Sequence, residues 1–212
     1  RIKDVSGHAQ KTALREVAQK FPHVEFRLSA NQNVILAGVP DADQAAINAL
    51  LASHGVKTEN QTSVLHAASM ACPALPTCGL ALAESERMLP GLLDRIEKLT
   101  GELGLGSEEI IIRSTGCPNG CARPYTAEIA FVGKAPGRYQ LWIGGSATGT
   151  RLNRVFKDVV KDPEIENELR PLFTRWRDQR SGASERFGDF CARVILPELA
   201  AAAAQPPAAP TA

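Results

Sequence analysis

The sequence predicts an α+β fold in which a small N-terminal unit precedes a larger mixed α/β domain. Three observations support this prediction. Helix and strand periodicities alternate before Gly55, an apolar hairpin pattern follows later in the chain, and amphipathic helical patterns flank that hairpin. Hydrophobic residues make up 44% and charged residues 22% of the 212 residues, a composition that is typical of soluble domains with a buried core.

The N-terminal unit contains four segments with a clear period. In chain order they are a helix, two strands and a second helix, expected at residues 10–20, 24–28, 34–37 and 42–54. Asp41 is expected to cap the second helix and Gly55 to end it, because these residue types satisfy or release the terminal backbone groups. Two strands are too few to form a stable sheet, so we expect the missing strands to lie outside this chain.

The larger domain is expected after a polar connector at residues 56–70. Its expected helices lie at residues 80–89, 91–103, 151–160 and 163–179, and its expected strands at residues 110–112, 127–133 and 138–143. The last two strands predict a hairpin, and Pro163 suits the first turn of its helix. An ordered segment is expected from residues 187–190 to Pro197, and the Ala/Pro-rich residues 198–212 predict a disordered tail.

The charge balance argues against nucleic acid and membrane surfaces as main partners. Lys and Arg together number 24, against 23 for Asp and Glu, so the chain has no strong net charge. The sequence has no apolar run long enough to span a bilayer. Residues 1–20 lack the pattern of a signal peptide, and a cytoplasmic location is therefore expected.

Five cysteines are present, and four of them form two close pairs. Cys72 and Cys78 enclose Pro-Ala-Leu-Pro-Thr, and Cys117 and Cys121 enclose Pro-Asn-Gly. In a cytosolic chain disulfides are the less common use of cysteine, and paired spacing is typical of metal ligands. Cys191 stands alone in an apolar context, and we interpret it as a buried structural thiol.

Spacing alone leaves three uses of the paired cysteines open. A structural zinc site also takes four cysteines, usually with shorter spacers, whereas a [4Fe–4S] cluster tolerates longer and variable ones; buried or disulfide-linked cysteines are the third use. The wide spacers and the proline after each leading cysteine favour the cluster. Turns rich in Pro and Gly present N–H groups to sulfur, and the helix expected over residues 79–89 would place its N-terminus near Cys78.

Six stretches of the chain are distinctive as motifs. They are ANQNVILAGVP at 30–40, ACPALPTCGLALAESER at 71–87, TGCPNGCARP at 115–124, AEIAFVGKAPGRY at 127–139, GTRLNR at 149–154 and FGDF at 187–190. Together they resemble the C-terminal half of the assimilatory sulfite reductase haemoproteins (beta component), which belong to the nitrite/sulfite reductase family. The resemblance covers nearly the whole chain except the Ala/Pro tail. Two cysteine motifs with matching flanks, in the same order, make it specific.

This resemblance implies an incomplete ferredoxin-like half-domain over residues 1–60 and a sirohaem- and [4Fe–4S]-binding domain over residues 61–197. It implies that the cluster is held by Cys72, Cys78, Cys117 and Cys121. It also implies that the sulfur of Cys121 bridges to the iron of sirohaem, where sulfite is reduced by six electrons to sulfide. A shared thiolate couples the two redox centres directly and donates electron density toward the substrate.

The resemblance further implies a polar pocket for sirohaem, whose many carboxylates need cationic and amide partners. The candidates are Asn31, Gln32, Asn33, Arg113, Thr115, Asn119, Arg123, Lys134, Arg138, Arg151 and Arg154. Thr115 and Asn119 are favoured because they flank cluster ligands, and Arg113 and Arg151 are kept with them. Residues 31–33 also suit a hairpin turn, and each cation also suits a surface ion pair.

Partners follow from the same resemblance. The basic residues that bind sulfite in this family lie in the N-terminal half of the enzyme, so this part alone is expected to be inactive and supplies no catalytic residue. The electron donor is expected to be a flavoprotein, as in NADPH-dependent enzymes, or a ferredoxin. Nitrite reductase is the alternative within the family. A zinc-stabilised interaction module and a haem-free electron-transfer protein are alternatives outside it.

Overall fold

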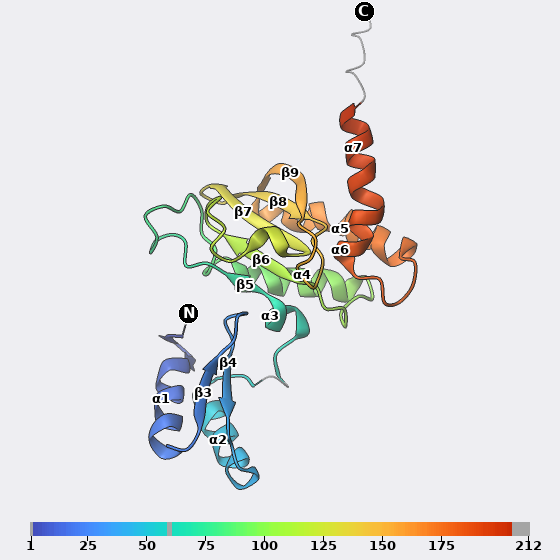
Figure 1. Ribbon diagram of the computed structural model, residues 1–212. Coiled ribbons are helices and arrows are strands. Elements are labelled where there is room, and N and C mark those ends of the chain that lie inside the picture. The colour runs from blue at the N-terminus through green and yellow to red at the C-terminus, as the bar shows by residue number, and fades with distance from the viewer. Residues whose placement is uncertain (1, 59–60, 205–212) are drawn as a thin grey trace, which may run out of the picture. The chain divides into compact units, whose positions relative to one another are not determined.

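The computed structural model describes residues 2–58 and 61–204 (Figure 1). The chain divides into two compact units, Arg1–Ala67 and Ala68–Ala212, each with its own buried apolar residues. Within the described ranges no helix combines the length and the apolar character that crossing a membrane requires.

The first unit confirms the four segments expected from periodicity. Its elements are β1 (Asp4–Val5), β2 (His8–Ala9), α1 (Gln10–Lys20), β3 (Glu25–Leu28), β4 (Val34–Ala37), α2 (Asp41–Ser53) and α3 (Val64–Ala68). The two-residue strands β1 and β2 pair with each other and are too short to leave a periodic signal. The antiparallel hairpin of β3 and β4 pairs Phe26 with Leu36.

The core of the first unit lies between its two longer helices and the hairpin. Ala13 and Val17 of α1 pack with Ile47 and Leu51 of α2, and Leu36 of β4 packs against this cluster. By contrast, all four residues of β3 are exposed. An exposed strand is consistent with the expectation that further strands come from outside the chain, which stays a prediction.

Two details of the first unit correct the sequence predictions. Asp41 is the first residue of α2 rather than its cap; Pro40 occupies the cap position, with an extended ψ of 148°, and no side chain caps the helix. The fixed φ of proline sets the turn, and the Asp41 carboxylate instead lies in the first turn, where the helix dipole favours it. The expected polar connector over 56–70 contains α3 and the start of a strand at Met70.

The second unit is built on one five-stranded sheet (Figure 1). In spatial order its strands are β5 (Met70–Ala71), β6 (Ile112–Thr115), β7 (Ile129–Ala135), β8 (Arg138–Ile143) and β9 (Arg154–Lys161). The first three run parallel to one another, and β8 and β9 continue the sheet as antiparallel strands. The predicted hairpin is confirmed as β7 and β8.

Helices of the second unit bury apolar faces. They are α4 (Leu89–Glu102), α5 (Ile165–Gln179), α6 (Phe187–Phe190) and α7 (Leu196–Ala204), with a π-helical turn at Cys191–Ile195 between the last two. The face predicted for α5 is confirmed, because Leu169, Phe173 and Trp176 are fully buried. Phe187 packs edge-on against Phe173 and Trp176, with ring centroids 5.1 and 5.6 Å away, and joins α6 to this core.

Several predicted elements of the second unit are wrong. The helix predicted over 151–160 is the strand β9, because Val155 and Val160 pair with β8 and this tertiary pairing overrides local propensity. The helix predicted over 80–89 is a series of turns, and Pro90 lies in the first turn of α4 rather than between two helices. The strand predicted over 110–112 starts at Ile112 and continues to Thr115.

The end of the chain also differs from the prediction. Residues 198–204, expected in the disordered tail, belong to α7. The six residues of this nine-residue helix that follow Glu198 are all alanine or leucine, and both types are strong helix formers. The rest of the predicted tail, residues 205–212, lies outside the described residues.

Candidate metal centre

The sheet brings the first cysteine of each pair to the same end of two neighbouring strands. Cys72 directly follows β5, and Cys117 follows β6 after a single glycine. These strands are neighbours and run parallel, so their carboxyl ends meet on the same side, where ligand sites of parallel sheets usually form. The Cys72 N–H donates to Ser114 O at 3.2 Å and continues the ladder into the loop.

The loop after β5 locks onto the loop after β6 through backbone hydrogen bonds. The N–H groups of Leu82 and Ala83 donate to Gly116 O at 2.8 and 3.1 Å. Within the first loop, the Cys78 N–H donates to Ala74 O at 2.8 Å. The helix predicted over 79–89 does not form, so no helix N-terminus lies beside Cys78. Turns and their hydrogen bonds to Gly116 fix the conformation of this loop instead.

Gly116 is the residue on which both loops converge. Its N–H donates to Cys72 Sγ at 3.2 Å. A Cβ at this position would lie 2.6 Å from Ala74 Cβ and 2.8 Å from Ala83 O. Such distances are far shorter than van der Waals contact, so only glycine allows the two loops to approach this closely.

Gly116→Ala is expected to lower the free energy of unfolding of the second unit by about 2 kcal/mol, because the added methyl overpacks a site with a backbone neighbour. Urea titration followed by tryptophan fluorescence measures this, since Trp142 and Trp176 both lie in the second unit. Gly79→Ala is the matched control. Gly79 lies beside Cys78, a Cβ added there would have no neighbour within 4 Å, and the variant should change stability by less than about 0.5 kcal/mol. Equal stability of both variants and the parent would contradict the close approach at Gly116.

Cys72 has two hydrogen-bond donors at its sulfur within an otherwise apolar cluster. Its side chain is buried, and its sulfur accepts hydrogen bonds from Gly116 N at 3.2 Å and from Thr115 Oγ1 at 3.5 Å. Donors of this kind stabilise a thiolate, which is the form that binds metal. Met70, Ala74 and Ala122 complete an apolar cluster around it.

The loop that contains Cys117 and Cys121 is fixed by a tight backbone turn and by contacts of Tyr125. Gly120 and Arg123 adopt left-handed backbone conformations, with φ of 71° and 51°. The Tyr125 hydroxyl donates to Pro118 O at 2.8 Å, and its ring packs edge-on against Trp142 at 5.0 Å. Burial, and then the nearby Cys117 thiol, raise the pKa of Tyr125 above its ordinary value, so its hydroxyl keeps the proton that it donates.

All five cysteines are free thiols, so none of the described pairs forms a disulfide. Cys72 and Cys117 are buried, Cys78 is partly exposed and Cys121 is exposed. In the described parts of the chain, no three of these sulfurs lie within 4.8 Å of one another.

Three further predicted residues lie close to these loops in the chain. Thr115 is fully buried and contacts Cys72, and Asn119 is exposed between Cys117 and Cys121. The buried Arg113 donates from Nη1 to Arg123 O at 3.0 Å and to the hydroxyl of Thr126. Its Nε has no partner among the described residues, and burial, followed by the charge of Arg123, lowers its pKa.

The remaining residues that were predicted to bind sirohaem have no described interaction with the paired cysteines. Arg151 donates to Gly144 O at 2.8 Å and to Asp189 Oδ1 at 2.6 Å, so it has protein partners of its own. Asn31, Gln32 and Asn33 form the turn between β3 and β4 in the first unit, where Asn33 N donates to Ser29 Oγ at 3.1 Å. Lys134 pairs with Asp158 at 3.1 Å, and Arg138 and Arg154 are exposed.

Sequence reasoning missed two residues that shape the site. Gly116 stands within the Thr-Gly-Cys triplet, and its position directly before a ligand-type cysteine was the available signal. Tyr125 follows the second pair closely, but its contact with Pro118 depends on a loop conformation that no local pattern specifies.

Cys191 is confirmed as a buried thiol, and burial, followed by the charge of Glu128, raises its pKa well above the ordinary value.

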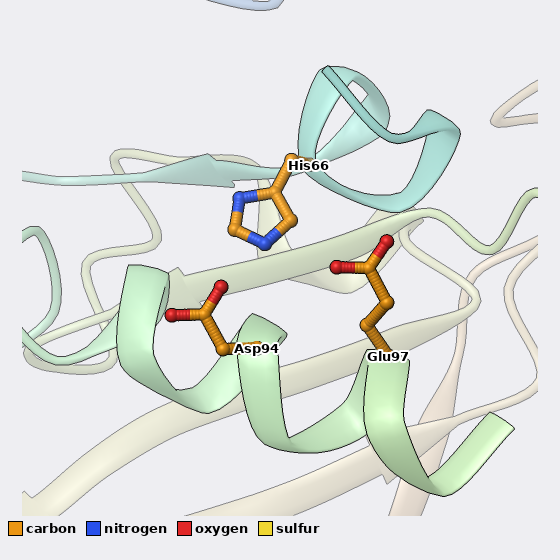
Figure 2. A group of neighbouring side chains, drawn as sticks. All are labelled: His66, Asp94 and Glu97. Carbon is orange, nitrogen blue, oxygen red and sulfur yellow. The ribbon is translucent and has the colours of Figure 1, made fainter. Parts of the chain in front are cut away.

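Figure 2 labels a second group of ligand-type side chains. Asp94 and Glu97 project from the same face of α4, and His66 lies on α3. The histidine belongs to the first unit and the two carboxylates to the second. The paired cysteines, which all lie in the second unit, are the candidate centre.

Comparison with known proteins identifies similarity in both units. Residues 4–54 match the nitrite/sulfite reductase ferredoxin-like half domain. Over 194 residues, 92% of this chain, it is 52% identical to the sulfite reductase [ferredoxin] of Synechococcus elongatus, of which it covers 31%. Over 198 residues, 93% of this chain, it is 48% identical to the sulfite reductase [NADPH] hemoprotein beta-component of Staphylococcus carnosus, of which it covers 34%.

A solved structure supports the fold. The NirA protein of Mycobacterium tuberculosis superposes with a TM-score of 0.73 at 22% sequence identity, over 86% of this chain and 35% of that one. The α+β architecture with a ferredoxin-like half domain is thereby confirmed. The chain spans about a third of the length of the curated relatives it matches.

Proposed function

From the premise that this chain belongs to the nitrite/sulfite reductase family, we propose that it is the cofactor-binding part of a sulfite reductase. One observation carries the proposal: the neighbouring parallel strands β5 and β6 each end in a cysteine loop, and both loops interlock at Gly116. This arrangement places Cys72 and Cys117, the first cysteine of each pair, after the carboxyl ends of neighbouring strands, with two hydrogen-bond donors at the Cys72 sulfur.

The donor set fits a [4Fe–4S] cluster. Cys72, Cys78, Cys117 and Cys121 would hold it, because they are free thiols and cysteine thiolates are the usual ligands of such clusters. Cys121 is the exposed member, which suits a sulfur shared with sirohaem. When bound, the cluster and sirohaem would supply the electrons and the iron centre for six-electron reduction of sulfite to sulfide.

The residues around the thiols orient and enclose them. Gly116 N and Thr115 Oγ1 fix Cys72, and the Tyr125 hydroxyl fixes the loop between Cys117 and Cys121. Arg113 is a buried cation without a carboxylate partner in the described chain, so it is suited to offset negative charge at the centre.

The other sirohaem contacts are part of the same proposal. They are Asn119, Arg151, Asn31, Gln32 and Asn33, together with Thr115 and Arg113. Asn119 is favoured by its exposed position between two of the cysteines. Arg151 is the weakest of them, because binding the cofactor would require it to give up or share its bonds to Gly144 and Asp189.

We propose the partners from the relatives' names and the span of the match. The N-terminal half of the enzyme would complete the substrate site, since the chain covers only about a third of each relative. Relatives are named both as ferredoxin and as NADPH enzymes, so the donor would be a ferredoxin or the flavoprotein of an NADPH-dependent complex. The reaction would take place in the cytoplasm.

Nitrite reduction is the second candidate, because the matched half domain is shared by nitrite and sulfite reductases. The two are separated by measuring the rates at which the assembled enzyme reduces sulfite and nitrite with a common dye as donor. A preference for nitrite would replace the proposed substrate and leave the cofactor assignment in place.

The test of the proposal is a spectrum with metal analysis. Protein purified without oxygen, alone and together with an N-terminal half, is analysed for visible absorption, iron, acid-labile sulfide and zinc. Sirohaem bands with iron and sulfide are expected for the assembled protein. A colourless protein with one bound zinc would indicate an interaction module instead, and cluster absorption without haem bands would indicate a haem-free electron carrier.

A further inference from the structure

One buried hydroxyl is directed at a proposed cluster ligand. Thr115 is fully buried, and its Oγ1 lies within donating distance of Cys72 Sγ, at 3.5 Å, beside the backbone donor at Gly116. In the part of the chain that the structure describes, the sulfurs of Cys78, Cys117 and Cys121 accept no hydrogen bond. Cys72 is therefore electrostatically distinct among the four thiols.

The Thr115 proton has two acceptors within reach, and charge decides between them. Besides Cys72 Sγ, Oγ1 lies 3.3 Å from Cys117 O. A hydroxyl carries one proton, and a hydrogen bond to an ionised acceptor is about twice as strong as one to a neutral acceptor. Once Cys72 is a metal-bound thiolate, the hydroxyl is expected to donate to it.

We propose that Thr115 is a positioning residue that raises the reduction potential of the cluster through its hydrogen bond to Cys72. This inference rests on the proposed function, because it requires the cluster to be bound there. An electron added to the cluster increases the negative charge on its thiolate ligands. A donor at the sulfur stabilises that reduced state more than the oxidised state, so the potential rises.

The same strand provides a matched control. Ser114 and Thr115 are adjacent on β6, and both are fully buried hydroxyl residues. Successive side chains of a strand project to opposite faces, so Ser114 faces away from Thr115. Its Oγ has no hydrogen-bond partner among the described residues. Ser114→Ala thus removes a buried hydroxyl from this strand without removing a bond to sulfur.

The test is a redox titration of the cluster, followed by electron paramagnetic resonance, in the assembled protein and its variants. Thr115→Val keeps the shape and removes the donor. It is expected to make one-electron reduction about tenfold less favourable, which lowers the potential by about 59 mV. Thr115→Ser restores the hydroxyl and is expected to have the parent's potential, as is Ser114→Ala. If Thr115→Val does not fold, Thr115→Ala tests the same loss with a smaller side chain.

The outcomes separate this inference from the function on which it rests. A cluster that is present in Thr115→Val at an unchanged potential would overturn the role of Thr115 and leave the proposed function intact. An equal shift in Ser114→Ala would also overturn it, because packing of the strand would then explain the change. A parent protein without iron and sulfide would remove the proposed function itself.

Discussion

Cys121→Ser is expected to weaken the sirohaem absorption bands about tenfold or more, because the proposed function makes this exposed thiol an iron ligand and a hydroxyl is a poor substitute for it. Iron and acid-labile sulfide should fall with the bands. The assembled protein is purified without oxygen, and its visible spectrum and iron content are compared with those of the parent. The fold should persist, since Cys121 contributes little buried surface.

Cys191→Ser is the control for this substitution. Cys191 is fully buried beside α6 in the π-helical turn, away from both cysteine loops in the chain. Placing a hydroxyl there should lower stability by about 1–2 kcal/mol and leave the spectrum of the folded protein unchanged. Equal losses of colour in both variants would contradict the assignment of Cys121, and full retention of the bands in Cys121→Ser would do the same.

Glu128→Gln is expected to lower the free energy of unfolding of the second unit by about 3 kcal/mol. Glu128 is fully buried directly before β7, and its carboxylate accepts from Ile111 N at 2.9 Å and Gly188 N at 3.0 Å. Arg186 donates to it at 2.7 Å. The amide keeps the shape but has one acceptor oxygen instead of two and no charge, so it leaves buried N–H groups and a guanidinium poorly paired.

Glu109→Gln tests whether burial is the reason. Glu109 also pairs with Arg186, at 3.0 Å, but its side chain is 50% exposed. An exposed pair contributes less than about 1 kcal/mol, so this variant should unfold at nearly the same urea concentration as the parent. Urea titrations of the two variants by tryptophan fluorescence give the comparison. Similar losses for both would mean that the buried carboxylate does not organise this region.

The hydrogen bonds of Glu128 explain why distant motifs occur together in the sequence. They join the segment before β6, the start of the β7 hairpin and the Phe-Gly-Asp-Phe motif at 187–190. Gly188 has to be glycine, because a Cβ there would lie 1.9 Å from Gly145 O. The sequence presents these motifs separately, and only the fold shows that one carboxylate connects them.

The sequence by itself determined those helices and strands whose apolar residues recur at a regular spacing. The helices over 10–20 and 163–179 and the β7–β8 hairpin follow from apolar spacing and turn residues, and the structure places them within a few residues of the prediction. The paired cysteines and their flanks likewise predicted the resemblance to sulfite reductases, and relatives of that name match most of the chain. These features depend on residues that are close together in the chain, so they can be predicted from a single sequence without knowledge of the fold.

Only the tertiary structure decided the features that depend on distant partners. Residues 154–161 form a strand because β8 provides a hydrogen-bonding edge, and the turns over 79–88 replace a helix because Gly116 O accepts their N–H groups. The meeting of the cysteine loops has the same origin. It requires β5 and β6 to be parallel neighbours although they are far apart in the chain, and hydrogen bonds of that kind leave no local period in the sequence.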